Sequence, residues 1–269
     1  MKNVLTLGLF LALSTPGYAQ EHVNDDDPTT GKIVNTTLSE ILMAADAYRN
    51  VWVRFPVQFV SVGTVKNPFF TRFVPARYAN FYAWAAEQEI WRLEEYTAPF
   101  PLLFLSKSSS QLERLYELKL YKQLYVTAVV RNVFQGEPWI EVMSFNETDA
   151  QVTTGVLAHL YRGEQFMQQR EWSKAISELS LAPAANAPDN VAAHVHKDLA
   201  VCFLRLGESK AALRHLDIAM SKMKEPDAAI RHLAYVAVKT PEKELDRTVT
   251  GAQVADHERP MWEAFEQVH

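Results

Sequence analysis

The chain has 269 residues, of which 48% are hydrophobic and 22% are charged, a composition typical of a globular protein with one or two domains. Its formal net charge of −5 argues against a general nucleic-acid binder, because binding to phosphates depends on an excess of Lys and Arg. A single cysteine, Cys202, leaves no partner for an intramolecular disulfide.

The first residues have the three parts of a secretory signal peptide. Lys2 supplies a positive charge, residues 4–13 are an apolar run, and Gly17 and Ala19 place small residues at a cleavage site. The run is shorter than the roughly 20 apolar residues of a membrane-spanning helix, although an uncleaved anchor is the alternative. We therefore expect residues 1–19 to be removed and no membrane span to remain. The protein would then be periplasmic or secreted, and the lack of disulfides favours a bacterial periplasm.

Residues 20–31 are polar and acidic and predict a disordered leader. A helix is expected over residues 37–48, where Thr37 and Glu40 have the spacing of a capping box. Strands are expected at the segments rich in β-branched and aromatic residues, which are 51–62, 99–105, 124–134 and 138–145.

A helix is predicted at 110–118, and the stretch 66–96 could hold a strand, a helix or both. Gln135-Gly136-Glu137 separates the last two strands, which should form a hairpin. This order of elements resembles the OB fold, a small barrel of about five strands with one helix. The expected fold class is thus α+β with two domains, the first being a small OB-like β barrel over residues 32–150. Another small α+β barrel or sheet is the alternative.

From residue 151 onward the chain is rich in helix formers and contains an internal repeat. Small and large residues recur at matching positions, namely Gly163, Phe166, Trp172, Ala175, Ile176 and Leu179, and then Ala200, Phe203, Gly207, Ala212, Leu213, Leu216 and Ala219. Ala175 and Ala212 are 37 residues apart, close to the tetratricopeptide period of about 34 residues plus a short insertion. The pattern over 155–224 resembles the tetratricopeptide repeat. The resemblance implies an all-α array of helical hairpins over 151–240, followed by a tail with a short helix over 241–269.

The resemblance also implies a groove for a protein or peptide partner, lined by the first helix of each repeat. The matching positions are Leu160, Glu164, Met167, His194, Lys197, Val201, Leu204 and Arg205. Such an apolar trough, edged by Lys197 and Arg205, would suit an extended peptide or an acidic chain end. The alternative is that this groove packs against the protein's own first domain.

A second candidate surface lies within residues 66–86, a stretch without any acidic residue. Its basic and aromatic members are Lys66, Arg72, Arg77, Tyr78, Tyr82 and Trp84. Basic groups beside aromatic rings can hold a glycan or another anionic polymer, and nucleic acid is not expected for an exported protein. The alternative is that these aromatic side chains belong to the core.

No motif for catalysis, a cofactor or a metal is recognisable. His194 and His196 lie two residues apart on a predicted helix and so point in different directions, and Cys202 is expected to be a buried structural thiol. The sequence therefore predicts an exported, non-catalytic adaptor that binds a protein through the tetratricopeptide groove. An envelope glycan-binding module, or a hydrolase with its site on the β domain, is the alternative.

We expect the exported protein to begin at or near Gln20, because the apolar run ends just before the small residues Gly17 and Ala19. N-terminal sequencing of material recovered from outside the cytoplasm measures this directly. An N-terminus at Met1 in that material would contradict the prediction.

Overall fold

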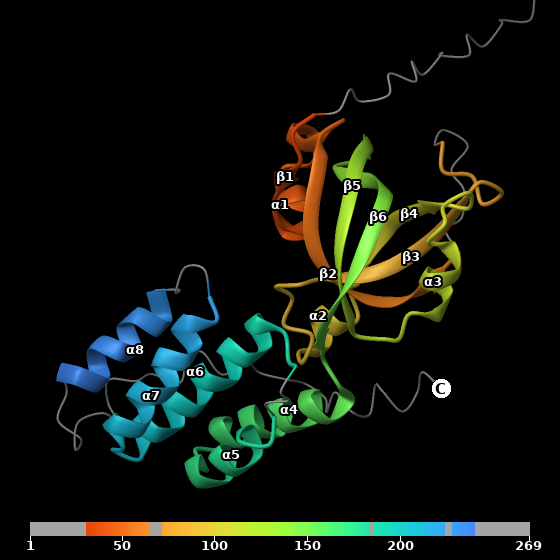
Figure 1. Ribbon diagram of the computed structural model, residues 1–269. Helices are drawn as coiled ribbons and strands as arrows, with labels where there is room; N and C mark the ends of the chain where they lie inside the picture. The colour runs from red at the N-terminus through yellow and green to blue at the C-terminus, as the bar shows by residue number, and fades with distance from the viewer. Residues whose placement is uncertain (1–30, 65–71, 183–185, 224–227, 240–269) are drawn as a thin grey trace, which may run out of the picture.

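The computed structural model describes residues 31–64, 72–182, 186–223 and 228–239 (Figure 1). The signal peptide, residues 20–30 of the leader, Lys66 and the C-terminal tail lie outside these ranges. In the part that is described, every helix is too short or too polar to cross a membrane.

The N-terminal half consists of strands with short helices between them. In chain order these elements are β1 (Val34–Asn35), α1 (Leu38–Met43), the 3-10 helix η1 (Ala45–Tyr48), β2 (Trp52–Gly63), β3 (Tyr78–Ala85), α2 (Leu93–Tyr96), β4 (Phe100–Ser106), α3 (Leu112–Glu117), β5 (Lys122–Phe134) and β6 (Glu137–Gln151). The strands form a six-stranded sheet in the order β1-β2-β3-β4-β6-β5, with a further pairing of β2 with β5. The pairs β1–β2 and β4–β6 are parallel and the others are antiparallel.

The expected fold class, a small OB-like β barrel followed by a tetratricopeptide-like array, is corrected by this arrangement. The structure has a mixed six-stranded sheet in its N-terminal half, followed by helices. The expectation rested on the order of elements, and order does not determine which strands pair. Two strands were not predicted as such. β1 pairs with β2 through Val34 and Asn35, and β3 lies within residues 66–96, where the secondary structure was left undecided.

Local signals in this half were predicted correctly. Thr37 accepts a hydrogen bond from the Glu40 amide in a complete capping box. β5 and β6 form the expected antiparallel hairpin, and its turn places Gln135 at φ 53° and Gly136 at φ 84°. Glycine adopts this left-handed conformation without steric cost, so the turn suits the sequence.

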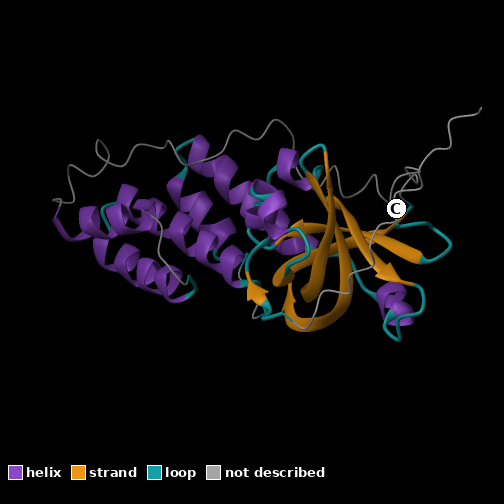
Figure 2. Cartoon of the chain, turned by 90° about the horizontal axis from the view of Figure 1, so that it is seen from above, coloured by secondary structure: helices purple, strands orange, loops and turns teal. Residues whose placement is uncertain are grey.

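The C-terminal half consists of helices α4 (Thr154–Gln168), α5 (Trp172–Leu179), α6 (Asp189–Arg205), α7 (Ser209–Ser221) and α8 (Ala228–Lys239). Successive helices pack on one another in sequence order. Figure 2 shows that they extend from one side of the sheet, with α8 at the end far from it in Figure 1.

One apolar core lies within the N-terminal half, between the sheet and its short helices. A second core runs through helices α4 to α8 and also includes residues of the sheet half. The residues that the sheet half adds to the helical core include Trp84, Ile90, Trp91 and Tyr121. Ile90 and Trp91 belong to the loop between β3 and α2, residues 86–92, which we call the junction loop. Because this loop is part of the helical core, the two halves are joined by apolar packing as well as by the chain.

The contact between α4 and α5 depends on the absence of a side chain at Gly163. A Cβ atom built there would lie 2.5 Å from Cγ of Leu179, which is fully buried. Real Cβ atoms do not approach carbon so closely, so any larger residue would force the buried Leu179 side chain or the helix that carries it to shift.

We therefore expect Gly163→Ala to lower the free energy of unfolding by about 1–3 kcal/mol through overpacking. Gly155→Ala on the same helix is the matched control, because its Cβ would meet only Thr153 Oγ1 at 3.8 Å. The control should be neutral or stabilising by up to about 1 kcal/mol, since alanine favours a helix more than glycine does. Urea unfolding measures the change in the free energy of unfolding for each variant. Equal changes for the two variants would contradict the close contact between Gly163 and Leu179.

Candidate functional site

The predicted groove residues lie on α4 and α6, and most of them face the interior. Six of the eight are buried: Leu160, Glu164, Met167, His194, Val201 and Leu204. Lys197 and Arg205 are half-buried, and the Arg205 guanidinium lies 5.4 Å from the ring centre of Trp172. In this structure the apolar part of the groove is therefore no open surface for a peptide.

The junction loop occupies the place expected for a ligand. Trp91 is 1% exposed and belongs to the same core as α4 and α6. Its ring centre lies 4.5 Å from that of His194 on α6, and its indole N–H donates to Oε1 of Glu164 on α4 at 3.1 Å. The described residues thus match the alternative in which the groove packs against the protein's own N-terminal half.

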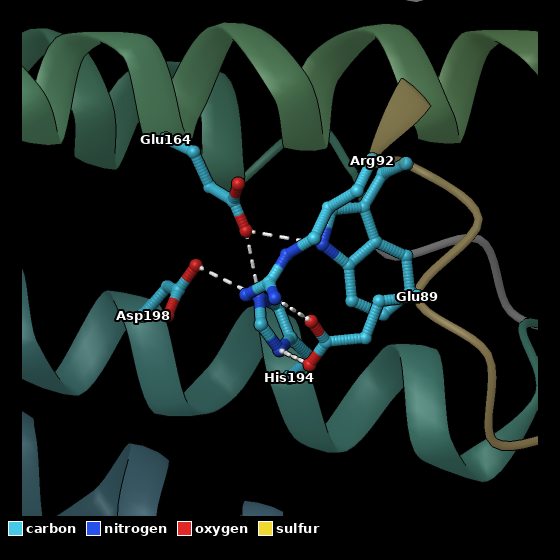
Figure 3. Close-up of polar contacts among 6 residues, drawn as sticks. Glu89, Arg92, Glu164, His194 and Asp198 are labelled. Atoms are coloured by element: carbon cyan, nitrogen blue, oxygen red, sulfur yellow. Dashed lines mark hydrogen bonds and ion pairs between the residues drawn. The ribbon is translucent and has the colours of Figure 1, made fainter. Parts of the chain in front are cut away.

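A group of buried polar side chains surrounds this tryptophan. His194 Nε2 lies 2.8 Å from Glu164 Oε1 and 3.2 Å from Asp198 Oδ2. Figure 3 shows Glu164 pointing from one helix towards His194 and Asp198 on another. We call Glu164, His194 and Asp198 the buried triad; their exposed fractions are 1%, 7% and 3%.

Two charged residues of the junction loop complete the surroundings of the triad. Glu89 forms an ion pair with Arg92 at 2.7 Å, and its other carboxylate oxygen lies 3.6 Å from His194 Nδ1. A cavity of about 190 Å³ adjoins the triad, lined by residues that include Glu89, Trp91, His194, Lys197, Met223 and Ile230. His194 therefore faces carboxylates on both sides of its ring.

The charge state of His194 follows from these neighbours. Burial lowers its pKa, but the charge of Asp198 and the hydrogen bonds with Asp198 and Glu164 outweigh burial and raise the pKa to about 9. Lys197 opposes the increase through its own positive charge. At neutral pH the ring is thus an imidazolium held between two carboxylates, an arrangement that stabilises buried charges.

Sequence reasoning found only part of this site. Glu164 and His194 were expected in a groove, whereas Asp198, Trp91 and the other junction-loop residues were not expected at all. One signal was available: His194 and Asp198 are four residues apart, a spacing that places two side chains on the same face of a helix. The sequence analysis compared His194 with His196 and not with Asp198. In the structure His196 contacts His215 on α7, with 2.9 Å between the two Nδ1 atoms.

The second predicted surface is divided between core and solvent. Tyr78 and Trp84 are buried, Arg72 and Tyr82 are half-buried, and Arg77 is exposed. Tyr78 donates to Oε1 of Glu141 at 3.0 Å, and Trp84 donates to the Tyr96 carbonyl at 3.0 Å. Among the described residues these aromatic rings therefore form no continuous exposed platform. Cys202 is fully buried, and burial raises its pKa.

The outer face of α8 presents two strongly exposed apolar side chains. Tyr235 is 62% exposed and Val238 is 65% exposed, although Ile230, Leu233, Val236 and Ala237 bury the opposite face. Basic or titratable residues flank the exposed pair, namely Arg231, His232 and Lys239, all of them exposed. We call these five residues the α8 outer face. The helix contains no acidic residue, which contrasts with the net charge of −5 for the chain.

Comparison with known proteins assigns no family. No protein-family model matches the chain, and no curated protein matches it. Among solved structures, the chain is similar to a protein of Leishmania major Friedlin that is provisionally assigned as an aspartyl-tRNA synthetase, with 8% identity and a TM-score of 0.29. That match covers 56% of this chain and 33% of the other, and a likeness at this level carries no argument about function.

We expect Trp91→Phe to destabilise the protein more than Trp139→Phe does, by about 1.5–3 kcal/mol, the contribution of a hydrogen bond to a charged group. Both rings are buried, but Trp91 donates to Glu164, whereas the indole nitrogen of Trp139 has no hydrogen-bond partner within the described ranges. Chemical unfolding of the two variants provides the measurement. Equal losses would show that the Trp91–Glu164 hydrogen bond contributes nothing to stability.

Proposed function

We propose that this protein is an exported, non-catalytic adaptor that holds a protein partner on its helical half. The observation that carries the proposal is the α8 outer face, where Tyr235 and Val238 are exposed side by side. Contiguous exposed apolar side chains with a polar rim are typical of protein-binding surfaces, and tyrosine is a frequent anchor residue there. Export rests on the signal-like sequence of residues 1–19.

The charge of this face indicates the chemistry of the partner. Arg231 and Lys239 flank the apolar pair, and no carboxylate of α8 offsets them. A partner segment that combines apolar side chains with acidic ones would complement this face, because electrostatic complementarity guides association and suppresses wrong partners. An amphipathic acidic helix is the simplest such segment.

The resemblance to tetratricopeptide repeats supports the same class of function, with a change in the surface used. Most residues of the groove implied by the resemblance are buried in the helical half, and Trp91 contacts two of them, Glu164 and His194. The outer face of α8 is instead exposed in the part of the chain that the structure describes. Because the junction loop packs into the helical core, a partner bound at α8 would be held in a defined position relative to the sheet.

The glycan-binding and hydrolase alternatives have less support. A glycan site on the sheet half would use exposed aromatic rings, and Tyr78 and Trp84 are buried there. The buried triad lies on α4 and α6 and not on the sheet. On the sheet half, buried Glu141 is already paired with Arg131 at 2.6 Å and accepts from Tyr78 at 3.0 Å. The adaptor is therefore the function that the described surface supports best.

We expect the double variant Tyr235→Ser with Val238→Ser to lose at least about tenfold in partner recovery, which corresponds to about 1.4 kcal/mol of binding free energy. Tagged wild-type and variant protein would be used to recover partners from the cell envelope, and the recovered proteins quantified by mass spectrometry. The melting temperature should change little, because exposed substitutions usually cost less than about 0.5 kcal/mol.

The matched control is Tyr116→Ser with Met143→Ser, which removes exposed apolar side chains from the sheet half, where they are 55% and 40% exposed. The control should recover the same partner as wild type. Equal recovery by the α8 variant would contradict the proposal. Self-association of the pure protein that only the α8 variant abolishes would replace the adaptor by a homo-oligomer formed through this face.

A further inference from the structure

The buried triad brings three metal-ligand atoms together. Each of Glu164, His194 and Asp198 offers one ligand atom, and the three atoms lie within 4.8 Å of one another. His194 Nε2 is 2.8 Å from Glu164 Oε1 and 3.2 Å from Asp198 Oδ2. Ligand atoms that lie about 2.0–2.2 Å from a tetrahedral zinc ion are roughly 3.3–3.6 Å apart. An ion could therefore enter between these atoms with small movements of the side chains.

The charges around the triad favour a cation. Glu164 and Asp198 are buried carboxylates. In the absence of an ion the proton on His194 balances one of their two negative charges, and a divalent ion that displaced this proton would balance both. Glu89 and Arg92 form an ion pair of their own, and Lys197 is the remaining positive group at the adjoining cavity. Buried charges of one sign are stable only when they are paired or coordinate a metal.

The neighbours of the triad also hold its members in the orientation that a ligand needs. Metal-binding histidines commonly direct their second ring nitrogen towards a carboxylate, and His194 Nδ1 faces Glu89 at 3.6 Å. The carboxylate ligand is oriented as well, because Trp91 donates to Glu164 at 3.1 Å. His194 and Asp198 come from one turn of α6, so the only long-range ligand is Glu164.

We propose that Glu164, His194 and Asp198 bind one divalent first-row metal ion, with Zn²⁺ preferred. One imidazole and two carboxylates form a nitrogen–oxygen ligand set that suits zinc, and manganese is the nearest competitor. A cavity of about 190 Å³, which His194 lines, lies beside the three ligands. The ion would join α4 to α6 beside the junction loop and would thereby stabilise the packing of these two helices.

The test uses the full-length chain without an affinity tag, treated with a chelator and then titrated with ZnCl₂ and, separately, MnCl₂ by calorimetry. We expect one ion per chain and a higher melting temperature with the ion bound, since a ligand that binds only the folded state stabilises it. Binding of neither ion would overturn the proposal.

Substitutions locate the ion. Asp198→Asn keeps the size of the side chain but removes its charge, and it should weaken binding at least about tenfold. Asp217→Asn, on the exposed side of α7, is the matched control and should bind as wild type does. Circular dichroism of the ion-free variants checks that they are folded, and Glu164→Gln replaces Asp198→Asn if that variant is not. Binding that survives Asp198→Asn but is lost in His215→Gln would place the ion at the His196–His215 pair and contradict the triad.

Discussion

The insertion of Trp91 between α4 and α6 is the interaction on which the rest of this structure depends. Its ring belongs to the helical core, and its N–H is bonded to Glu164. A buried indole contributes a large apolar surface and also requires a partner for its polar atom. Both requirements are met only when the sheet half and the helical half are in contact, so this residue couples their folding.

The same insertion determines which surfaces remain for a partner. Leu160, Met167 and Leu204, which were expected to line a groove, are instead buried in the core that also contains Trp91. The helices are therefore accessible through their outer faces. The outer face of α8 combines strongly exposed apolar groups with positive charge.

The polar side chains beside Trp91 add specificity to this junction. Apolar packing alone tolerates many arrangements, whereas a buried carboxylate is costly unless its partners are in place. Glu164 has a partner on α6 and another in the junction loop, so sliding either segment would leave its charge unsatisfied. With either a proton or a metal ion in the triad, these contacts form only when α4, α6 and the junction loop are correctly positioned relative to one another.

The sequence by itself determined the features that depend on neighbouring residues. The capping box at Thr37, the hairpin turn at Gly136 and the periodic apolar faces of the C-terminal helices all arise from contacts within a few positions of the chain. The spacing of His194 and Asp198 also placed them on one helix face. These features were predictable because short-range geometry is fixed by residue type.

The tertiary structure alone decided the pairing of strands, the filling of the groove and the position of Glu164 opposite His194. β1 pairs with β2, and Trp91 reaches a residue 73 positions further along the chain. Such contacts depend on how whole elements pack, and the sequence pattern of each element is compatible with several partners. For that reason an expected binding groove became the internal junction between the sheet and the helices.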